Sequence, residues 1–176
     1  MSTTQEGLRS HRLVWTAKDR LAPLSHSSAS LVSDNERIEY PDGLRWTCIR
    51  CANSCRDLPG RERNILLTPK DVDRIARATK REAKEFSVPS PDHFPYDRSM
   101  RKHEGRCIFL RGSGCSIYKA RPLICRFYPF FLDRSKEGGL KIGHDPACSG
   151  VGKGKVLSEK FFEGLAKLAK RELSIE

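Results

Sequence analysis

Residues 107–131 read CIFLRGSGCSIYKARPLICRFYPFF, a stretch in which three cysteines are embedded in apolar or arginine-rich sequence. The chain has seven cysteines, which fall in three groups: Cys48, Cys51 and Cys55; Cys107, Cys115 and Cys125; and Cys148. Two cysteines separated by two residues can bind one metal, because one turn of backbone brings both sulfurs to the same side. We therefore predict that all seven converge on a metal or iron–sulfur site.

The sequence outside the cysteine groups indicates the cellular compartment of the protein. No apolar stretch in the 176 residues approaches the roughly 20 needed to span a bilayer, and the N-terminus lacks the apolar core of a signal peptide. We therefore expect a cytoplasmic protein without a membrane span. Cytoplasmic thiols are kept reduced, so the cysteines are expected to be ligands rather than disulfides.

The chain is strongly basic, with a formal net charge of +11. This charge suits an acidic partner such as nucleic acid or a membrane surface, or else a basic surface that contacts only solvent. The basic residues are spread along the sequence, without the compact basic and aromatic motif of many single-strand binders. A protein partner is also expected.

We predict a peripheral segment over residues 1–35 and one cysteine-cluster domain over residues 36–176. Residues 37–47 are expected to form a hairpin, since Pro41-Asp42-Gly43 is typical of a turn. Thr68 is expected to cap a helix over residues 69–78, with Pro69 in its first turn and Asp71 completing a capping box.

The remaining elements are predicted to be short. Thr79 is expected to cap a second helix ending near Phe86, and the proline-containing residues 87–105 a long loop. Residues 107–110 suggest a strand, residues 116–129 helical turns, and residues 130–142 a hairpin about Gly138-Gly139. A helical apolar period runs over residues 157–173. The predicted fold class is α+β: a small single domain, mostly helical, with short strands and hairpins around the metal site.

Several blocks together resemble a known family. They are Leu67-Thr68-x2-Asp71, Cys107-Ile108-Phe109-Leu110, Cys115-Ser116-Ile117-Tyr118, Arg121-Pro122-x2-Cys125-Arg126-Phe127-Tyr128-Pro129-Phe130 and Cys148-Ser149-Gly150. The pattern is similar to that of the YkgJ-type cysteine-cluster proteins, whose C-x2-C-x2-C-C motif and later cysteines are associated with zinc or iron chelation. The resemblance implies a metal bound by the matching cysteines.

One position departs from that motif. Ser54 stands where the family places the first of its paired cysteines. The resemblance implies eight thiolates, and this chain has seven. Either the site needs fewer, or a histidine, an aspartate or a solvent molecule takes the remaining place.

Cysteine spacing accommodates both zinc and an iron–sulfur cluster, since both accept four thiolates. Because the motifs contain many cysteines and no histidine, we favour an iron–sulfur cluster of the [4Fe–4S] type over Zn²⁺. His103 and His144 each precede a cysteine by four residues and are expected either at the surface or as ligands. Arg121 and Arg126 flank Cys125, where they could offset thiolate charge at the cofactor or pair with carboxylates.

The sequence thus predicts a metal-chelating protein with a structural or electron-transfer role. No Walker A loop, dinucleotide-binding glycine motif, nucleophile elbow or helical zinc-protease motif is present. One alternative is a component of a methyl-transfer or redox enzyme, since the family resembles the cysteine-rich part of flagellin lysine N-methylases. Another is a zinc-dependent nucleic-acid-binding module.

Overall fold

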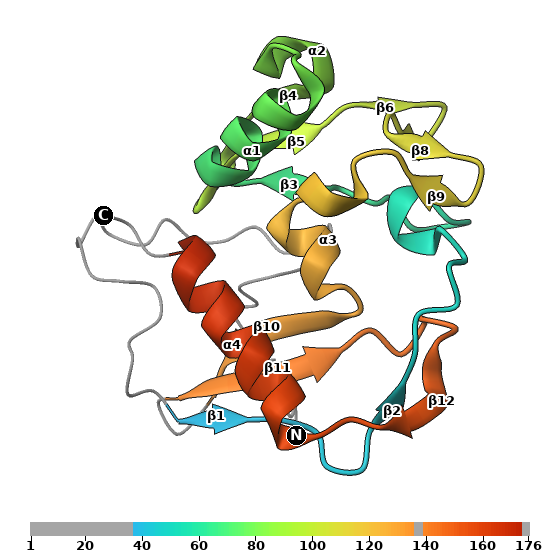
Figure 1. Ribbon diagram of the computed structural model, residues 1–176, viewed down its shortest axis with the longest axis vertical. Helices are drawn as coiled ribbons and strands as arrows, with labels where there is room; N and C mark the ends of the chain where they lie inside the picture. The colour runs from blue at the N-terminus through green and yellow to red at the C-terminus, as the bar shows by residue number, and fades with distance from the viewer. Residues whose placement is uncertain (1–36, 136–138, 174–176) are drawn as a thin grey trace, which may run out of the picture.

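The computed structural model describes residues 37–135 and 139–173 (Figure 1). The predicted peripheral segment, residues 1–35, lies outside these ranges, as does Gly138 of the predicted glycine turn. The helices are α1 (Pro69–Thr79), α2 (Ala83–Phe86), α3 (Leu123–Phe127) and α4 (Glu159–Leu173), with 3-10 turns η1 (Asn53–Cys55) and η2 (Tyr118–Ala120). None of the helices in the described ranges is long and apolar enough to cross a membrane.

Within the described residues, the strands are short and form five small sheets. They are β1 (Ile38–Glu39), β2 (Arg45–Trp46), β3 (Leu66–Leu67), β4 (Ser87–His93), β5 (Tyr96–Met100), β6 (Lys102–His103), β7 (Arg106–Cys107), β8 (Leu110–Arg111), β9 (Gly114–Cys115), β10 (Phe130–Arg134), β11 (Leu140–His144) and β12 (Val151–Val156). The sheet orders are β1-β11-β10, β12-β2, β3-β5-β4, β6-β7 and β8-β9.

The prediction that the domain is mostly helical is wrong. Strand, at 33%, slightly exceeds helix, at 31%, so the α+β domain is built from small sheets as much as from helices. Much of the difference lies in residues 87–105, where β4 and β5 pair antiparallel in place of the predicted loop. Pro89 and Pro91 lie in β4, which is an edge strand of its sheet, where a missing N–H can be tolerated.

The predicted hairpin over residues 37–47 is also wrong, although the turn at Gly43 is present with a φ of +63°. Instead β1 pairs parallel with β11, and β2 pairs antiparallel with β12. Ile38 and Trp46 pack against the core below α4, so burial of these side chains takes each strand to a partner more than 100 positions away. The hairpin of β10 and β11 is confirmed, with Leu132 opposite Ile142.

Two apolar cores stabilise the domain. The α4 core contains Leu123, Phe127, Phe130, Leu132, Leu140, Ile142, Phe162, Leu165, Ala169 and Leu173. The α1 core contains Ile65, Leu67, Ile75, Phe86, Met100, Cys107, Phe109, Leu110, Ile117 and Ala120. Helix α3 lies between the two groups of elements in Figure 1. Its Leu123 and Phe127 belong to the α4 core, while Ile124 and Cys125 pack on the α1 core.

The predicted capping box of α1 is confirmed and does more than begin the helix. Thr68 accepts from the Asp71 backbone N–H at 3.1 Å, and Asp71 accepts from the Thr68 N–H at 3.1 Å. Fully buried Asp71 also accepts from the Leu123 backbone N–H at 3.0 Å and pairs with Arg74. The carboxylate therefore fixes the start of α3 to the start of α1.

We expect Asp71→Ala to lower the free energy of unfolding by about 3 kcal/mol, because it removes a helix cap and leaves the buried Leu123 N–H without its acceptor. Urea unfolding of the metal-loaded protein measures the change. Asp73→Ala, at an exposed position of the same helix, is the matched control and should be nearly neutral. Equal effects of the two substitutions would contradict this role of Asp71.

Candidate metal centre

Cys55 and Cys107 are brought together by backbone pairing. Arg56 and Arg106 form an isolated antiparallel bridge, so the residues on either side of them, Cys55 and Cys107, lie across from one another. The Asp57 N–H donates to the Gly105 carbonyl at 2.7 Å and continues the pairing. This contact joins the end of the first cysteine group to the start of the second.

Cys115 and Cys125 reach the same region from two further segments. Cys115 lies in β9, opposite Leu110 of β8, and the Ser116 N–H donates to the Phe109 carbonyl at 2.9 Å. Cys125 is carried by α3, whose start is fixed by Asp71. Thus a short hairpin presents one thiol and a capped helical turn presents the other.

These four residues form what we call the inner thiol cluster: Cys55, Cys107, Cys115 and Cys125. Cys107 belongs to the α1 core, and the other three pack against it. Burial raises the pKa of the Cys107 thiol to about 11, and the neighbouring Cys55 and Cys115 thiols add to the shift. Burial likewise raises the pKa of Cys125, with contributions from the other three thiols, so each thiol of the cluster lies within electrostatic reach of Cys125.

The thiols are not arranged as a finished metal site. Within residues 37–135 and 139–173, no three cysteine, histidine, aspartate or glutamate side chains are placed closely enough to hold a metal ion. All seven cysteines are free. Ligation by the inner thiol cluster would therefore need its side chains to draw together around the metal, as is common where binding and folding are coupled.

The remaining cysteines, Cys48, Cys51 and Cys148, are called the outer cysteines. Cys48 is exposed, Cys51 half-buried and Cys148 buried. The segments of Cys48 and Cys148 are adjacent, because the Thr47 N–H donates to the Gly150 carbonyl at 3.2 Å. Cys148 also lies near Tyr128: burial raises the pKa of Tyr128 to about 12, and the Cys148 thiol contributes to that rise. That these three join the inner four at one centre stays a prediction.

Ser54 lies in η1, between Cys51 and Cys55 in the sequence. Its hydroxyl is 3.7 Å from the Cys55 sulfur, and its side chain lines a pocket that Cys125 also lines. Position 54 therefore lies beside the inner thiol cluster, near Cys55 and Cys125.

The flanking arginines have different surroundings. Arg121 lies 3.9 Å above the exposed Tyr118 ring and lowers the pKa of Cys115 against the larger effect of burial, which places its charge near the inner thiol cluster. Arg126 donates to Glu172 of α4 at 3.0 Å. It therefore pairs with a carboxylate, one of the two expectations for the arginines beside Cys125. A cofactor contact by either arginine stays a prediction.

Glu172 is the centre of an ion-pair network that the sequence did not reveal. Burial opposes its ionisation, but Arg74, Arg171 and Arg126 together hold its pKa below the usual value. The three guanidiniums each lie 3.0 Å from its carboxylate oxygens. The network ties α1, α3 and α4 together. Arg74 and Arg126 lie 98 and 46 positions from Glu172, so no local sequence motif could indicate their pairing with it.

The two histidines have different surroundings, and His103 pairs with Arg106, next to Cys107, in the hairpin of β6 and β7. His103 is exposed in β6, in agreement with a surface position. His144 is half-buried at the end of β11 and lines the pocket that Ser54 and Cys125 also line. Ligation by either histidine stays a prediction.

The donor set of the inner thiol cluster fits a thiophilic metal centre. It offers four sulfurs beside an apolar core. Burial raises the pKa of the Cys107, Cys115 and Cys125 thiols, so a cation that displaces their protons, as Zn²⁺ and iron do, would make them ligands. Four thiolates satisfy a structural zinc site or an iron–sulfur cluster, whereas Ca²⁺ and Mg²⁺ require oxygen donors.

Comparison with known proteins agrees with this chemistry. Residues 47–149, more than half of the chain, match the CxxCxxCC family model, described as "Putative zinc- or iron-chelating domain". The uncharacterized protein MJ0661 of Methanocaldococcus jannaschii is 34% identical over 139 residues, covering 72% of each chain. No solved structure matches. The chain therefore belongs to the CxxCxxCC family of zinc- or iron-chelating domains.

Proposed function

We propose that this domain chelates one metal centre through the inner thiol cluster. The observation that carries the proposal is that Cys55, Cys107, Cys115 and Cys125, from four separate segments, pack on one apolar core. Free buried thiols have no need to gather in this way, whereas ligands of one centre must. Metal analysis of the purified chain tests the proposal: at least one centre per chain supports it, and a folded, metal-free chain contradicts it.

We infer that the centre is an iron–sulfur cluster of the [4Fe–4S] type. Four cysteine thiolates are the usual ligands of such a cluster, and the charge of Arg121 near Cys115 suits the negative charge of a thiolate cluster. A bound cluster would supply one-electron transfer. Zinc is the second candidate, because the family description names it and the same four thiolates would complete a closed structural zinc site.

We further propose that the outer cysteines form a second metal site that lacks one thiolate. Cys48 and Cys148 lie on adjacent segments, and Cys51 follows Cys48 after two intervening residues. Ser54 stands where the family motif has a further cysteine. A serine hydroxyl is a poor ligand beside thiolates, since its proton is far harder to remove. We therefore expect three thiolates and an open or substituted position there.

We expect Ser54→Cys to raise the metal content or affinity of the anaerobically purified protein, because the new thiolate completes the family's set of eight. Metal analysis and the visible spectrum measure the change. Ser158→Cys, at an exposed position before α4, adds a thiol far along the chain and should change neither. If Ser54→Cys behaves like this control, the vacancy at position 54 is refuted while the four-thiolate centre is not.

A further inference from the structure

Positive charge is concentrated in the segments that carry the cysteines. Residues 43–56, 105–132 and 146–158 contain all seven cysteines and ten of the 33 lysines and arginines, but none of the 22 aspartates and glutamates. The rest of the chain is almost neutral, so these segments account for nearly all of the net charge of +11. A four-thiolate centre of zinc or of the [4Fe–4S] type would offset only about two of these charges, and a second site with three thiolates about one more. The surface around the cysteines therefore stays positive with the metal bound.

We call the exposed part of these segments the basic face. Strand β12 pairs with β2, which leads into the first cysteine group, and the bridge of Arg56 with Arg106 joins that group to β7. In Figure 1 β2, β12 and the β8–β9 hairpin lie along the same side of the molecule. The fold thus gathers charges that are spread along the chain. The exposed cations of the basic face are Arg45, Arg50, Arg56, Arg106, Arg111, Lys119, Lys153 and Lys155.

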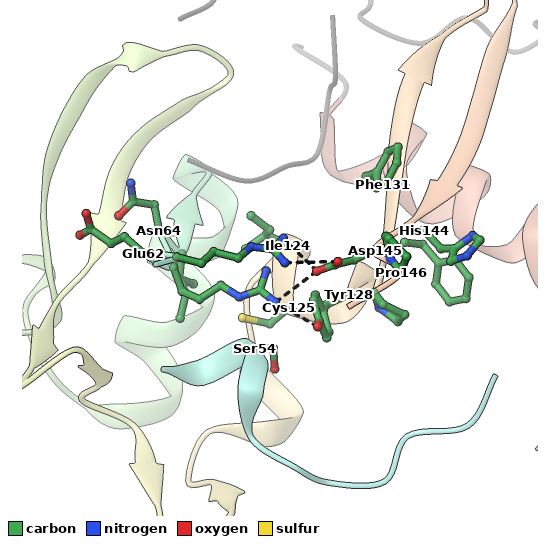
Figure 2. A pocket seen from close by; sticks show the side chains of 15 residues that line it. Ser54, Glu62, Asn64, Ile124, Cys125, Tyr128, Phe131, His144, Asp145 and Pro146 are labelled. Atoms are coloured by element: carbon green, nitrogen blue, oxygen red, sulfur yellow. Dashed lines mark hydrogen bonds and ion pairs between the residues drawn. The ribbon is translucent and has the colours of Figure 1, made fainter. Parts of the chain in front are cut away.

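Three carboxylates beside the basic face are matched by three cations that lie outside it. The pairs are Asp145 with Arg61 and Arg63, and Lys102 with Asp57 and Glu62. Figure 2 shows the first of these groups, with dashed lines from the arginine side chains that converge on Asp145. The charges of these six groups cancel, so they neutralise none of the cations of the basic face.

Other carboxylates lie at the margins of the basic face. Asp42 and Glu159 flank the end of the β2–β12 pair that is away from the cysteines, where both lie near Tyr40. Glu104, in the turn between β6 and β7, adjoins Arg106 in the strand pair and offsets one charge. The basic face therefore keeps most of its positive charge.

Hydrogen bonds position several arginines of the basic face without neutralising them. Arg45, Arg56 and Arg111 each donate to a backbone carbonyl, at 2.8, 2.9 and 2.8 Å. Such a bond orients a guanidinium but leaves its charge and its other N–H groups available. Arg56 and Arg106 stand directly opposite one another in their bridge, where like charges repel unless an anion lies between them. An anionic partner would therefore meet groups that are already in place.

An exposed aromatic ring accompanies these charges. Tyr118 follows Cys115 by three residues and is 60% exposed. The guanidinium carbon of Arg121 lies 3.9 Å from the centre of the Tyr118 ring, and Arg121 also donates to the Tyr118 carbonyl at 2.9 Å. The guanidinium covers one face of the ring, which leaves the exposed face for a planar ligand such as a nucleobase.

We propose that the basic face binds single-stranded nucleic acid, with phosphates along its arginines and lysines and a base stacked on Tyr118. A positive surface that follows the backbone and an aromatic ring that stacks a base are the two components of single-strand binding sites. Five of the eight exposed cations are arginines, whose planar edges match phosphate oxygens. The centre of a protein–protein interface is depleted of charged residues, so this surface suits a polyanion better than a protein. The proposal goes beyond chelation and does not depend on which metal is bound.

Fluorescence anisotropy of labelled single strands of RNA and of DNA, about 16 nucleotides long, tests this binding with the purified full-length protein and its resident metal. We expect saturable binding of at least one of the two strands, and their comparison shows whether the 2′-hydroxyl contributes. A plot of log affinity against log salt should fall by about 0.7 for each phosphate contacted, so Arg106→Ala should make the slope shallower by about 0.7. Lys84→Ala is the matched control and should leave the slope unchanged, since Lys84 is 78% exposed but pairs with Glu82 outside the basic face.

Tyr118→Leu should weaken binding about tenfold or more without changing the salt slope, because it removes a stacking surface and no charge. Phe94→Leu is the matched control, since Phe94 is 53% exposed in the turn between β4 and β5, outside the basic face. Metal content is measured for every variant and should be unchanged, because neither Tyr118 nor Arg106 is a proposed ligand. If Arg106→Ala loses its metal, Lys153→Ala in β12 takes its place.

The absence of saturable binding of either strand at about 50 mM salt would overturn the proposal, as would equal effects of Tyr118→Leu and Phe94→Leu. Duplex DNA that binds as tightly as the single strands, or polyglutamate that competes equally well with them, would also overturn it, because charge alone would then account for binding. If the purified protein contains no metal yet binds single strands, the proposed chelation fails while this proposal stands.

Discussion

Removal of the metal is expected to lower the melting temperature by about 20 °C or more, given a ligation free energy near 10 kcal/mol and a chain of this size. The physical reason is the structure around the inner thiol cluster. The strands β6, β7, β8 and β9 that surround Cys107 and Cys115 contain two residues each, too few for independent stability. The metal would therefore hold these segments to α3 and to the first cysteine group, which ends at Cys55.

Thermal unfolding of the loaded and metal-free protein, followed by circular dichroism, measures this effect. Zinc is removed with a chelator and iron by acid under anaerobic conditions, with metal analysis to verify removal. Return of the metal should restore the original melting curve, which separates metal loss from damage to the thiols. An unchanged curve after verified removal would show that the domain folds without the centre.

The second large effect is expected from single cysteine substitutions. Cys125→Ser should abolish metal binding at the inner thiol cluster and destabilise the domain, because Cys125 is carried by the helix that joins both cores. Cys48→Ser is the matched comparison: Cys48 is exposed, and its loss should leave the inner centre loaded. Metal content per chain and melting temperature are measured for both variants. Equal losses from the two would contradict the division into inner and outer cysteines.

Local signals in the sequence predicted part of this fold well. Thr68, Pro69 and Asp71 lie within four positions of one another, so their chemistry alone marks the start of α1. The apolar period of residues 157–173 likewise predicts α4, whose Phe162, Leu165 and Ala169 are buried. Both signals depend on neighbours one turn apart, which a sequence displays directly.

Pairing between distant segments could not be predicted in the same way. The parallel pairing of Ile38 with Leu140 and the antiparallel pairing of Trp46 with Val151 depend on the assembled core. Prolines made residues 87–105 resemble a loop, although β4 lies at a sheet edge where a proline is compatible with a strand. The predominance of helix was overestimated for this reason.

The site shows the same division. Spacing identified the seven cysteines as candidate ligands, and the structure groups Cys55, Cys107, Cys115 and Cys125 through the bridge of Arg56 with Arg106 and the helix α3. The pairing of Arg61 and Arg63 with Asp145 was not predicted, since Asp145 lies more than 80 positions from both arginines. The alternation of charges at residues 61–63 was its only local sign.

Anaerobic purification followed by iron, sulfide and zinc analysis, together with the visible spectrum, tests the central claim most directly. The proposed centre predicts four iron and four sulfide per chain, as a [4Fe–4S] cluster contains, with broad visible absorption that Cys125→Ser abolishes. If the protein instead contains one zinc per chain, and Cys125→Ser loses it, the thiolate centre is supported but its metal is zinc rather than an iron–sulfur cluster. A folded chain containing neither metal, with an ordinary melting curve, would contradict the claim that this domain chelates a metal through its inner thiol cluster.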